Sequence, residues 1–480
     1  MTRIRRRRLL FGIAAAAAAG TAVIAWGLQQ ISPAQFTRSA DQHYADVARH
    51  REAQRAQPSP DLVGQPVPAV GVSARSRPPV ASSTDSTTDG AVSAPPYWTD
   101  FRGPERDGHY RQRPILTSWP ERPLTPMWKQ PVGGGYASFT AAHGRIFTIE
   151  QRGGQEVVAA YDLRSGRELW THGWAAAFRE GMGGDGPRAT PTWHEGRLYA
   201  LGATGELHAL DDRRGRLLWR ANILEDAGTT NREWGISGSP LIVDDTVVVL
   251  PGGPGGHSVA AYDRRTGARR WSALDDRQSY ASPMLATIAG VRQILVFSES
   301  RLMGLTTDGG LLWEFPWRTG GASSINASQP IVLGNRVFIS TGYGTGAAMV
   351  EVRREEDRLA VRELWRTIRM KNQFTSSVHH EGFIYGLDEN ILACIDAATG
   401  ELKWKAGRYG YGQVVLAAGH LIVISDAGDL ALVRATPERH VEIARFPALE
   451  GRSWNHPAIV DGILLIRNSN EMAAFDLNVR

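Results

Sequence analysis

Short runs of alternating apolar and polar residues, separated by turns rich in glycine and aspartate, fill the chain from about residue 97 onward. Residues 205–210, Gly-Glu-Leu-His-Ala-Leu, are one example. A period of two residues places the apolar side chains on one face of a β-strand. No long stretch with helical periodicity lies between these runs, so the pattern predicts an all-β domain over residues 97–480.

One eleven-residue string recurs within this domain. It reads Ala-Tyr-Asp-Leu-Arg-Ser-Gly-Arg-Glu-Leu-Trp at 160–170 and returns at 209–219, 261–271 and 394–404. Looser copies bring the closing aromatic residues to eight, at intervals of roughly 40–50 residues, which is the length of a four-stranded propeller blade. These closing residues are Trp128, Trp170, Trp219, Trp271, Trp313, Trp365, Trp404 and Phe446.

The residues of the repeat suit a structural role. Each aspartate can accept hydrogen bonds from backbone N–H groups in a tight turn, and the glycine allows a positive φ there. Each tryptophan has an apolar ring to pack between blades and an N–H to anchor. The aspartates that we assign to this role, beside the tryptophans, are Asp162, Asp211, Asp263 and Asp396.

The two ends of the domain each hold an incomplete unit. The last copy, residues 473–480, stops before its tryptophan strand, and Trp128 has no preceding aspartate turn. Pairing the ends would make one complete blade and remove an open sheet edge. We therefore predict an eight-bladed β-propeller of four-stranded blades, closed by a strand at 124–132.

The first 96 residues differ from the rest. A basic stretch, Arg3–Arg8, precedes an apolar run, Leu9–Leu28, whose length would span ~30 Å of hydrocarbon as a helix. We expect a signal-anchor in residues 1–30, with the propeller in the periplasm and a single transmembrane helix in the bacterial inner membrane. Cleavage near residues 25–27, which would export the protein, stays open. Residues 31–96 form a Pro/Ser/Ala-rich disordered linker with a short helix expected at 41–57.

The charge of the chain excludes one class of partner. The formal net charge is +5, and the five arginines at positions 3 and 5–8 account for all of it. The remaining chain is neutral, so we expect no nucleic-acid partner. Phosphate-loop, zinc-protease, hydrolase and EF-hand motifs are also absent from the sequence.

The Ala-x-Asp-x-x-Thr-Gly-x-x-x-Trp string resembles the repeat of the PQQ-like β-propeller superfamily, which includes quinoprotein alcohol dehydrogenases and the BamB family. Strings at 100–108, 184–192, 237–240, 251–256 and 370–377 also resemble a bacterial group of PQQ-binding-like propellers. The resemblance implies PQQ held over the axis, with calcium on Glu and Asn side chains, an Asp base and a disulfide of adjacent cysteines. This chain has one cysteine, Cys394, inside a repeat strand, and no stretch that matches the cofactor motif.

The loops before the innermost strands of a propeller gather around one mouth of its channel. Here they carry residues that suit ligand or partner binding, since aromatic rings stack or anchor and Arg188 can contact an anion. The predicted site comprises Tyr136, Asp185, Arg188, Trp234, Tyr280, Asn326, Asn372, Tyr411 and Trp454. Asp185, Glu233 and Asn326 are weak calcium candidates. The alternative is that the rings fill the channel mouth and the polar residues cap turns.

The sequence thus favours a membrane-tethered periplasmic propeller that binds or scaffolds an envelope protein partner or a small ligand, in the manner of BamB. The alternative is a PQQ- and calcium-dependent quinoprotein dehydrogenase with a divergent site at the mouth. The sequence identifies no catalytic residue, and PQQ and calcium remain open as cofactors.

Overall fold

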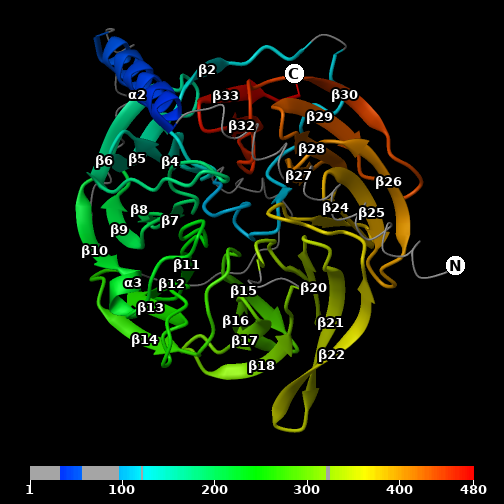
Figure 1. Ribbon diagram of the computed structural model, residues 1–480. Helices are drawn as coiled ribbons and strands as arrows, with labels where there is room; N and C mark the ends of the chain where they lie inside the picture. The colour runs from blue at the N-terminus through cyan, green and yellow to red at the C-terminus, as the bar shows by residue number, and fades with distance from the viewer. Residues whose placement is uncertain (1–32, 57–96, 121–122, 320–324, 480) are drawn as a thin grey trace, which may run out of the picture.

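Eight β-sheets are arranged around a central axis in the computed structural model (Figure 1). The structure describes residues 33–56, 97–120, 123–319 and 325–479. Each blade has four strands that follow one another antiparallel from the axis outward, and blade 7 gains a fifth strand, β1 (His109–Tyr110), on its inner side. The predicted all-β, eight-bladed propeller is confirmed.

We number the blades in chain order of their innermost strands. Blades 1 to 4 consist of β3 (Thr140–Ala142), β4 (Arg145–Arg152), β5 (Gln155–Asp162) and β6 (Glu168–Ala175); β7 (Thr192–His194), β8 (Arg197–Leu201), β9 (Glu206–Asp211) and β10 (Leu217–Asn222); β11 (Leu241–Val243), β12 (Thr246–Val249), β13 (Val259–Asp263) and β14 (Arg269–Ala273); and β15 (Met284–Ile288), β16 (Val291–Phe297), β17 (Arg301–Leu305) and β18 (Leu311–Pro316). A four-residue helix, α3 (Ile223–Asp226), follows β10.

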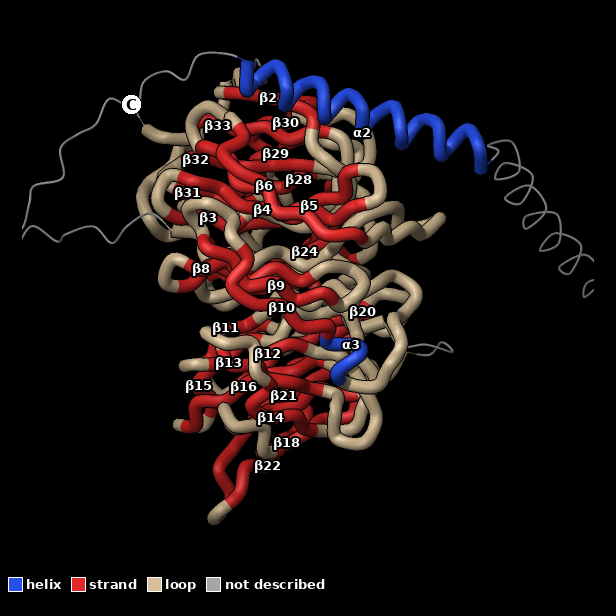
Figure 2. The backbone as a smooth tube through the Cα atoms, turned by 90° about the vertical axis from the view of Figure 1, so that its left-hand side faces the viewer, coloured by secondary structure: helices blue, strands red, loops and turns tan. Residues whose placement is uncertain are grey.

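Blades 5 to 8 consist of β19 (Ile331–Leu333), β20 (Arg336–Thr341), β21 (Gly346–Glu355) and β22 (Arg358–Thr367); β23 (Val378–His380), β24 (Phe383–Asp388), β25 (Ile391–Asp396) and β26 (Leu402–Arg408); β27 (Gln413–Ala417), β28 (His420–Ile424), β29 (Asp429–Arg434) and β30 (Glu442–Pro447); and β31 (Ala458–Val460), β32 (Ile463–Arg467), β33 (Glu471–Asp476) and β2 (Trp128–Pro131). The hairpin of β21 and β22 projects beyond the ring (Figures 1 and 2).

Blade 8 closes the ring with strands from both ends of the domain. Strand β2 pairs antiparallel with β33, so that Trp128 lies opposite Ala474 and Pro131 opposite Glu471. The backbone N–H of Val132 also donates to the carbonyl of Asn470 at 2.9 Å. The predicted closure is therefore confirmed, with a strand shorter than the expected 124–132.

The repeat residues form one contact that recurs between neighbouring blades. The Trp170 indole of blade 1 donates to the Asp212 carbonyl of blade 2 at 3.0 Å. Its ring lies against Gly215, which has φ +66°, and a Cβ there would lie 2.3 Å from the ring. The Asp211 carboxylate accepts from the backbone N–H groups of Arg213 and Arg214. The repeat therefore joins the outer strand of blade 1 to the turn of blade 2.

The same contact recurs around the ring, with some variation. Indole N–H groups reach carbonyls of the next blade in the pairs Trp128–Leu163, Trp219–Arg264, Trp365–Ala397 and Trp404–Thr436. Trp313 differs, because it donates to Gln293 of its own blade at 2.6 Å. The structural role predicted for the repeat is thus the one that these contacts serve.

Helix α2 (Pro33–Ala56) lies outside the ring beside β2 (Figures 1 and 2). It begins at Pro33, before the helix expected at 41–57, and it packs against the propeller. Val47 and Arg51 are buried, and Arg51 donates to the Gln130 side chain at 3.0 Å and to the Pro131 carbonyl at 2.7 Å. This helix therefore covers the closing strand.

Two further predictions for the N-terminal part of the chain are a transmembrane helix and a disordered linker. Residues 1–30 and most of the linker, 57–96, lie outside the described residues. Among the helices that the structure describes, none combines the length and the apolar character needed to cross a bilayer. The transmembrane helix and the disordered linker stay predictions.

A segment that precedes the first blade enters the central channel. Residues 99–108, which we call the plug, run across the centre of the ring, where Figure 1 shows the chain in cyan. Arg106 is buried and donates to the Pro283 carbonyl at 2.8 Å and to the carbonyls of Ser239 and Pro240. Arg102 is buried on the other side and donates to the carbonyl of Ser377 at 2.7 Å. The two arginines thus hold the plug to opposite parts of the ring.

Candidate functional site

A cavity of about 320 Å³ occupies the mouth of the channel. Seven aromatic rings line it, from six loops and the plug: Phe101, Tyr136, Trp234, Tyr280, Tyr343, Phe374 and Trp454. The other lining residues are Met182, Gly183, Arg188, Ser237, Ser239, Ser282, Ile325, Ala327, Gln373, Gln413 and His456. The cavity is therefore mainly apolar, as small-molecule and anchor pockets generally are.

The rings pack against one another in two groups. Phe374 contacts Trp454 with centroids 4.6 Å apart, and Trp454 contacts Tyr136 at 5.5 Å. Across the mouth, Trp234 and Tyr280 lie 5.5 Å apart. Tilted pairs at these separations support one another, so the rings form a fixed wall.

Two of the lining side chains extend into solvent. Met182 has 65% of its surface exposed, and Tyr343 has 44%. Soluble proteins seldom gather large apolar side chains at the edge of an apolar cavity unless something covers them. The rim of the mouth thus has the character of an interaction surface.

Arg188 is the one side chain with a formal charge among the described lining residues. Its guanidinium lies over the rings of Phe178, at 4.5 Å, and Tyr136, at 5.5 Å. It donates to the carbonyls of Gly184, at 2.7 Å, and Gly186. Burial lowers the pKa of Arg188, against the opposing effect of Tyr136 and nearby carboxylates. The cation thus holds its own loop and still faces the cavity.

The floor of the cavity is made by the plug and by the loop before β31. The Phe101 ring contacts the His456 ring at 5.7 Å, and an Arg102 amino group lies 3.3 Å from His456 Nε2. Burial and the Arg102 charge hold the pKa of His456 well below its ordinary value. His456 is therefore neutral, and the channel is closed beneath the mouth.

The structure separates the predicted site residues into two groups. Tyr136, Arg188, Trp234, Tyr280 and Trp454 line the cavity. Tyr411 does not line it, but its ring contacts Phe374 at 5.5 Å. The aromatic half of the prediction therefore meets at one point, together with Arg188.

The predicted polar residues have other contacts. Asn326 is fully buried and donates to the Ser298 carbonyl at 2.8 Å while accepting from Thr341 at 2.7 Å. Asn372, also fully buried, donates to the Leu387 carbonyl at 3.0 Å. Both amides hold loops in place, which is the role the alternative interpretation gave them.

The calcium candidates do not converge on the cavity. Glu233 is exposed and Asp185 is partly buried, and neither lines the cavity. Asp185 instead acts on Tyr44 of α2, where burial and this carboxylate raise the pKa of the hydroxyl to about 12. Within the described ranges, no three His, Cys, Asp or Glu side chains are placed to hold a metal ion. The calcium interpretation of Asp185, Glu233 and Asn326 is therefore not supported.

Several lining residues were not predicted. Gln413 begins β27 and His456 lies just before β31, close in sequence to the predicted Tyr411 and Trp454, so their position was a usable signal. Phe101 belongs to a string noted only for its resemblance, and Tyr343 lies in a turn between β20 and β21. Only the packing of the plug and of that turn brings these two residues to the mouth.

Comparison with known proteins agrees with this architecture. The family model described as "Outer membrane protein assembly factor BamB" matches residues 153–406, just over half of the 480 residues. The chain belongs to this family. BamB of Moranella endobia is 24% identical over 292 residues, which cover 57% of this chain and 68% of that protein.

A second relative is an enzyme. The 1-butanol dehydrogenase (cytochrome c) of Thauera butanivorans is 32% identical over 99 residues. That stretch covers 20% of this chain and only 14% of the dehydrogenase. The match therefore concerns a small part of each protein.

Solved structures share the fold. BamB from Moraxella catarrhalis superposes with a TM-score of 0.54 and 16% identity, covering 75% of this chain and 99% of that one. Quinohemoprotein alcohol dehydrogenase from Comamonas testosteroni gives a TM-score of 0.58 and 12% identity, covering 81% and 82%. At these identities the likeness establishes the propeller alone.

Proposed function

We propose that this protein is a non-catalytic binding module that holds a partner protein of the cell envelope at the mouth of its propeller. The observation that carries the proposal is the aromatic cavity with exposed Met182 and Tyr343 at its rim. Buried aromatic pockets with an apolar rim accept the anchor side chains that dominate protein interfaces. Membership of the BamB family supports a binding role.

The mouth favours a particular kind of anchor. Its walls are aromatic, and Arg188 is its one formal charge among the described lining residues. An apolar side chain with a carboxylate nearby would satisfy both the rings and the guanidinium. We therefore expect the partner to present an apolar or aromatic residue next to an acidic one.

Within the described part of the chain, the cavity lacks the carboxylates that would hold the calcium ion of the quinoprotein dehydrogenases. Calcium takes six to eight oxygen ligands, commonly carboxylates. None of the described lining residues is Asp or Glu, and the Asn326 amide is engaged inside the fold. The described lining residues thus give calcium no adequate ligand set.

The second candidate function is a quinoprotein dehydrogenase, which the short match to 1-butanol dehydrogenase favours. Purified full-length protein mixed with PQQ and Ca²⁺ separates the two. The binding proposal predicts no bound-quinone spectrum and no dye reduction with alcohols. Saturable quinone binding with turnover would replace it with the dehydrogenase.

Affinity purification of the full chain from its own cells, with quantitative mass spectrometry, tests the binding role itself. The mouth variant Tyr343→Ala/Phe374→Ala should lose a partner that the wild-type protein retains. The control Leu311→Ala/Leu402→Ala removes side chains that are 47% and 37% exposed on outer strands. It should keep that partner. Recovery of the same amount of that partner with both variants would refute binding at the mouth.

The proposal includes the location of the protein in the cell. We infer that residues 1–30 tether the propeller to the inner membrane, because Arg3–Arg8 precede an apolar run of membrane-spanning length. Cell fractionation of the full chain and of a chain lacking residues 1–30 tests this. Membrane recovery of both chains would contradict it.

A further inference from the structure

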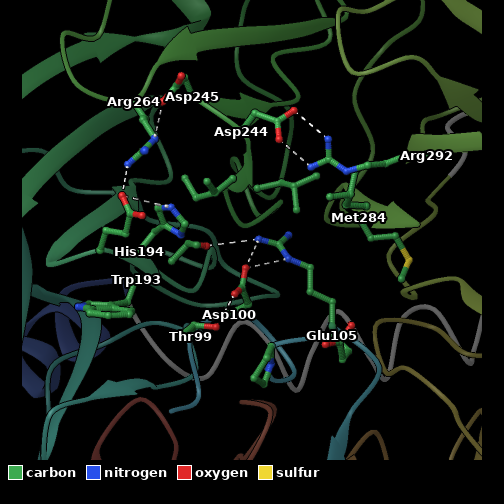
Figure 3. A pocket seen from close by; sticks show the side chains of 17 residues that line it. Thr99, Asp100, Glu105, Trp193, His194, Asp244, Asp245, Arg264, Met284 and Arg292 are labelled. Atoms are coloured by element: carbon green, nitrogen blue, oxygen red, sulfur yellow. Dashed lines mark hydrogen bonds and ion pairs between the residues drawn. The ribbon is translucent and has the colours of Figure 1, made fainter. Parts of the chain in front are cut away.

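A second cavity, of about 610 Å³, lies at the end of the channel opposite the mouth. Its walls are the plug, residues of the innermost strands β7, β11 and β15, and the turns that follow β7 and β11 (Figure 3). We call it the lower cavity. It is larger than the cavity at the mouth, and nothing in the proposed function uses it.

The path of the chain before the first blade explains why this sector is open. Strand β1 pairs with β27 of blade 7, and Ile115 pairs with Asn478 beyond β33. Trp98 pairs with Ala141 of blade 1. These contacts cover blades 7, 8 and 1 on this face. Blades 2 to 4 contribute the walls of the lower cavity.

The lining carries more negative than positive charge. Five carboxylates and three guanidinium groups line the cavity, and Arg265, outside the lining, lies 3.9 Å from one of these carboxylates, that of Asp245. The carboxylates are those of Asp100, Glu105, Glu195, Asp244 and Asp245, and the cations are Arg106, Arg264 and Arg292.

The three arginines are already neutralised by neighbours. Arg292 makes two bonds to Asp244, at 2.8 and 2.9 Å. Arg264 bonds Glu195 at 2.7 Å and Asp245 at 3.2 Å. Arg106 bonds Asp100 through two nitrogens, at 3.1 and 2.9 Å, and uses its other donors on the ring. The cavity therefore offers little to an anion.

Glu105 is the carboxylate that the fold leaves free. It lies on the plug with an exposed side chain, and Figure 3 draws no interaction from it, in contrast to Asp100 and Asp244. The outer oxygens of Asp245 and Glu195 also face solvent, with side chains 70% and 65% exposed. These oxygens can accept hydrogen bonds from a ligand.

One wall is apolar. Leu241 and Met284 are buried in the ring and line the cavity. Ile242 and Leu285 extend this wall. A ligand that satisfies both walls has a cationic head and an aliphatic body, because alkyl stems lie along apolar surfaces while ammonium groups meet carboxylates.

We propose that the lower cavity binds an organic cation, an ammonium or guanidinium group on an aliphatic stem, through Glu105 and the apolar wall. The source is either a small polyamine or the basic side chains of a polypeptide, and both share this chemistry. The site is independent of the mouth, because it uses other residues on the opposite face of the ring.

Isothermal titration calorimetry of the full-length protein tests the proposal with two probes, spermidine and the blocked tripeptide Lys-Leu-Lys. At least one probe should bind saturably, and its affinity should fall when salt is raised from 50 to 300 mM. Binding of spermidine alone identifies a polyamine site, and binding of the tripeptide alone identifies a polypeptide site. Failure of both probes to bind overturns the proposal.

Two variants locate the binding. Glu105→Gln should weaken the affinity about tenfold, the effect of losing one charge-assisted bond. The control Glu356→Gln removes another exposed carboxylate, at the tip of the hairpin between β21 and β22. It should leave the affinity unchanged. Equal affinities for Glu105→Gln and wild type, or equal weakening by both variants, would place the binding elsewhere and overturn the assignment.

Discussion

The outer edge of this propeller and its centre are held together by different kinds of contact. At the outer edge, an indole of one blade packs on the glycine turn of the next, as Trp170 packs on Gly215. We call this junction between two blades a seam. At the centre, the mouth loops differ in length and sequence, and their rings meet without a repeated pattern.

The difference separates stability from binding. Trp219 is buried in the seam between blades 2 and 3, and its indole N–H donates to the Arg264 carbonyl at 3.1 Å. Its side chain therefore stabilises the packing of the two blades. Trp234 has a partly exposed ring that faces the cavity. Tryptophan, which packs the blades together in the repeat, is thus also present at the mouth, where its ring can contact a ligand.

The largest expected effect compares these two tryptophans directly. Trp219→Ala should lower the free energy of unfolding by about 4 kcal/mol, because it leaves a cavity where the buried ring packed and removes one hydrogen bond to the Arg264 carbonyl. Trp234→Ala should cost about 1 kcal/mol or less. Chemical denaturation of both variants measures the difference. Similar losses would mean that the mouth ring is as structural as the seam.

The seam between blades 8 and 1 contains a buried carboxylate, that of Glu150. This group predicts that the stability of the protein depends on pH. Glu150 is fully buried and accepts from the Gly133 N–H at 2.6 Å and the Tyr161 hydroxyl at 2.8 Å. Burial alone would raise its pKa, but the charges of Arg152, Arg467 and Arg51 outweigh burial and hold it at about 2. Its contribution to stability is therefore present above the ordinary pKa of 4.5 and is lost as the pH falls toward 2.

Glu150→Gln should destabilise the protein on the order of 3 kcal/mol at pH 7, because it removes the carboxylate that compensates buried guanidinium groups. The gap between wild type and variant should narrow from pH 5 to pH 2 in denaturant titrations. Asp357→Asn, at an exposed hairpin tip, is the control and should show no such gap. A constant gap across this range would rule out an ionised Glu150.

A smaller effect tests the glycine of the seam. Gly215→Ala combines a positive φ with a Cβ 2.3 Å from the Trp170 ring, whereas Gly144 has φ +70° and open space around it. Gly144→Ala thus measures the backbone cost alone. Gly215→Ala should lose about 2 kcal/mol more than this control, because of overpacking. Thermal unfolding of both variants gives the values, and equal losses would exclude the contact.

Periodicity explains how much the sequence could predict. A closing aromatic recurs eight times in the sequence, and the full string with its Asp and Gly recurs four times, so recurrence indicated the role of Asp162, Gly166 and Trp170. The truncated copies at the two ends predicted the closure. A helix was expected at 41–57, but it begins at Pro33, and its contact through Arg51 depends on the closing strand β2 of blade 8.

The centre has no such repetition. Loop position alone identified Trp234 and Trp454, because every loop before an inner strand leads to the mouth. It also suggested Asn326, whose amide turned inward to satisfy buried carbonyls. Phe101 reaches the mouth only because Arg102 and Arg106 hold the plug in the channel, and no local pattern carries that information.

Site-specific photocrosslinking in living cells tests the central claim, that a protein partner docks at the mouth. A photoreactive amino acid replaces Tyr343, 44% exposed at the rim, or Leu311, 47% exposed on the outer strand of blade 4. Crosslinking from position 343 should yield one discrete adduct, identified by mass spectrometry and lost in the Phe374→Ala background, with none from position 311. The same adduct from both positions, or none from position 343, would contradict the account.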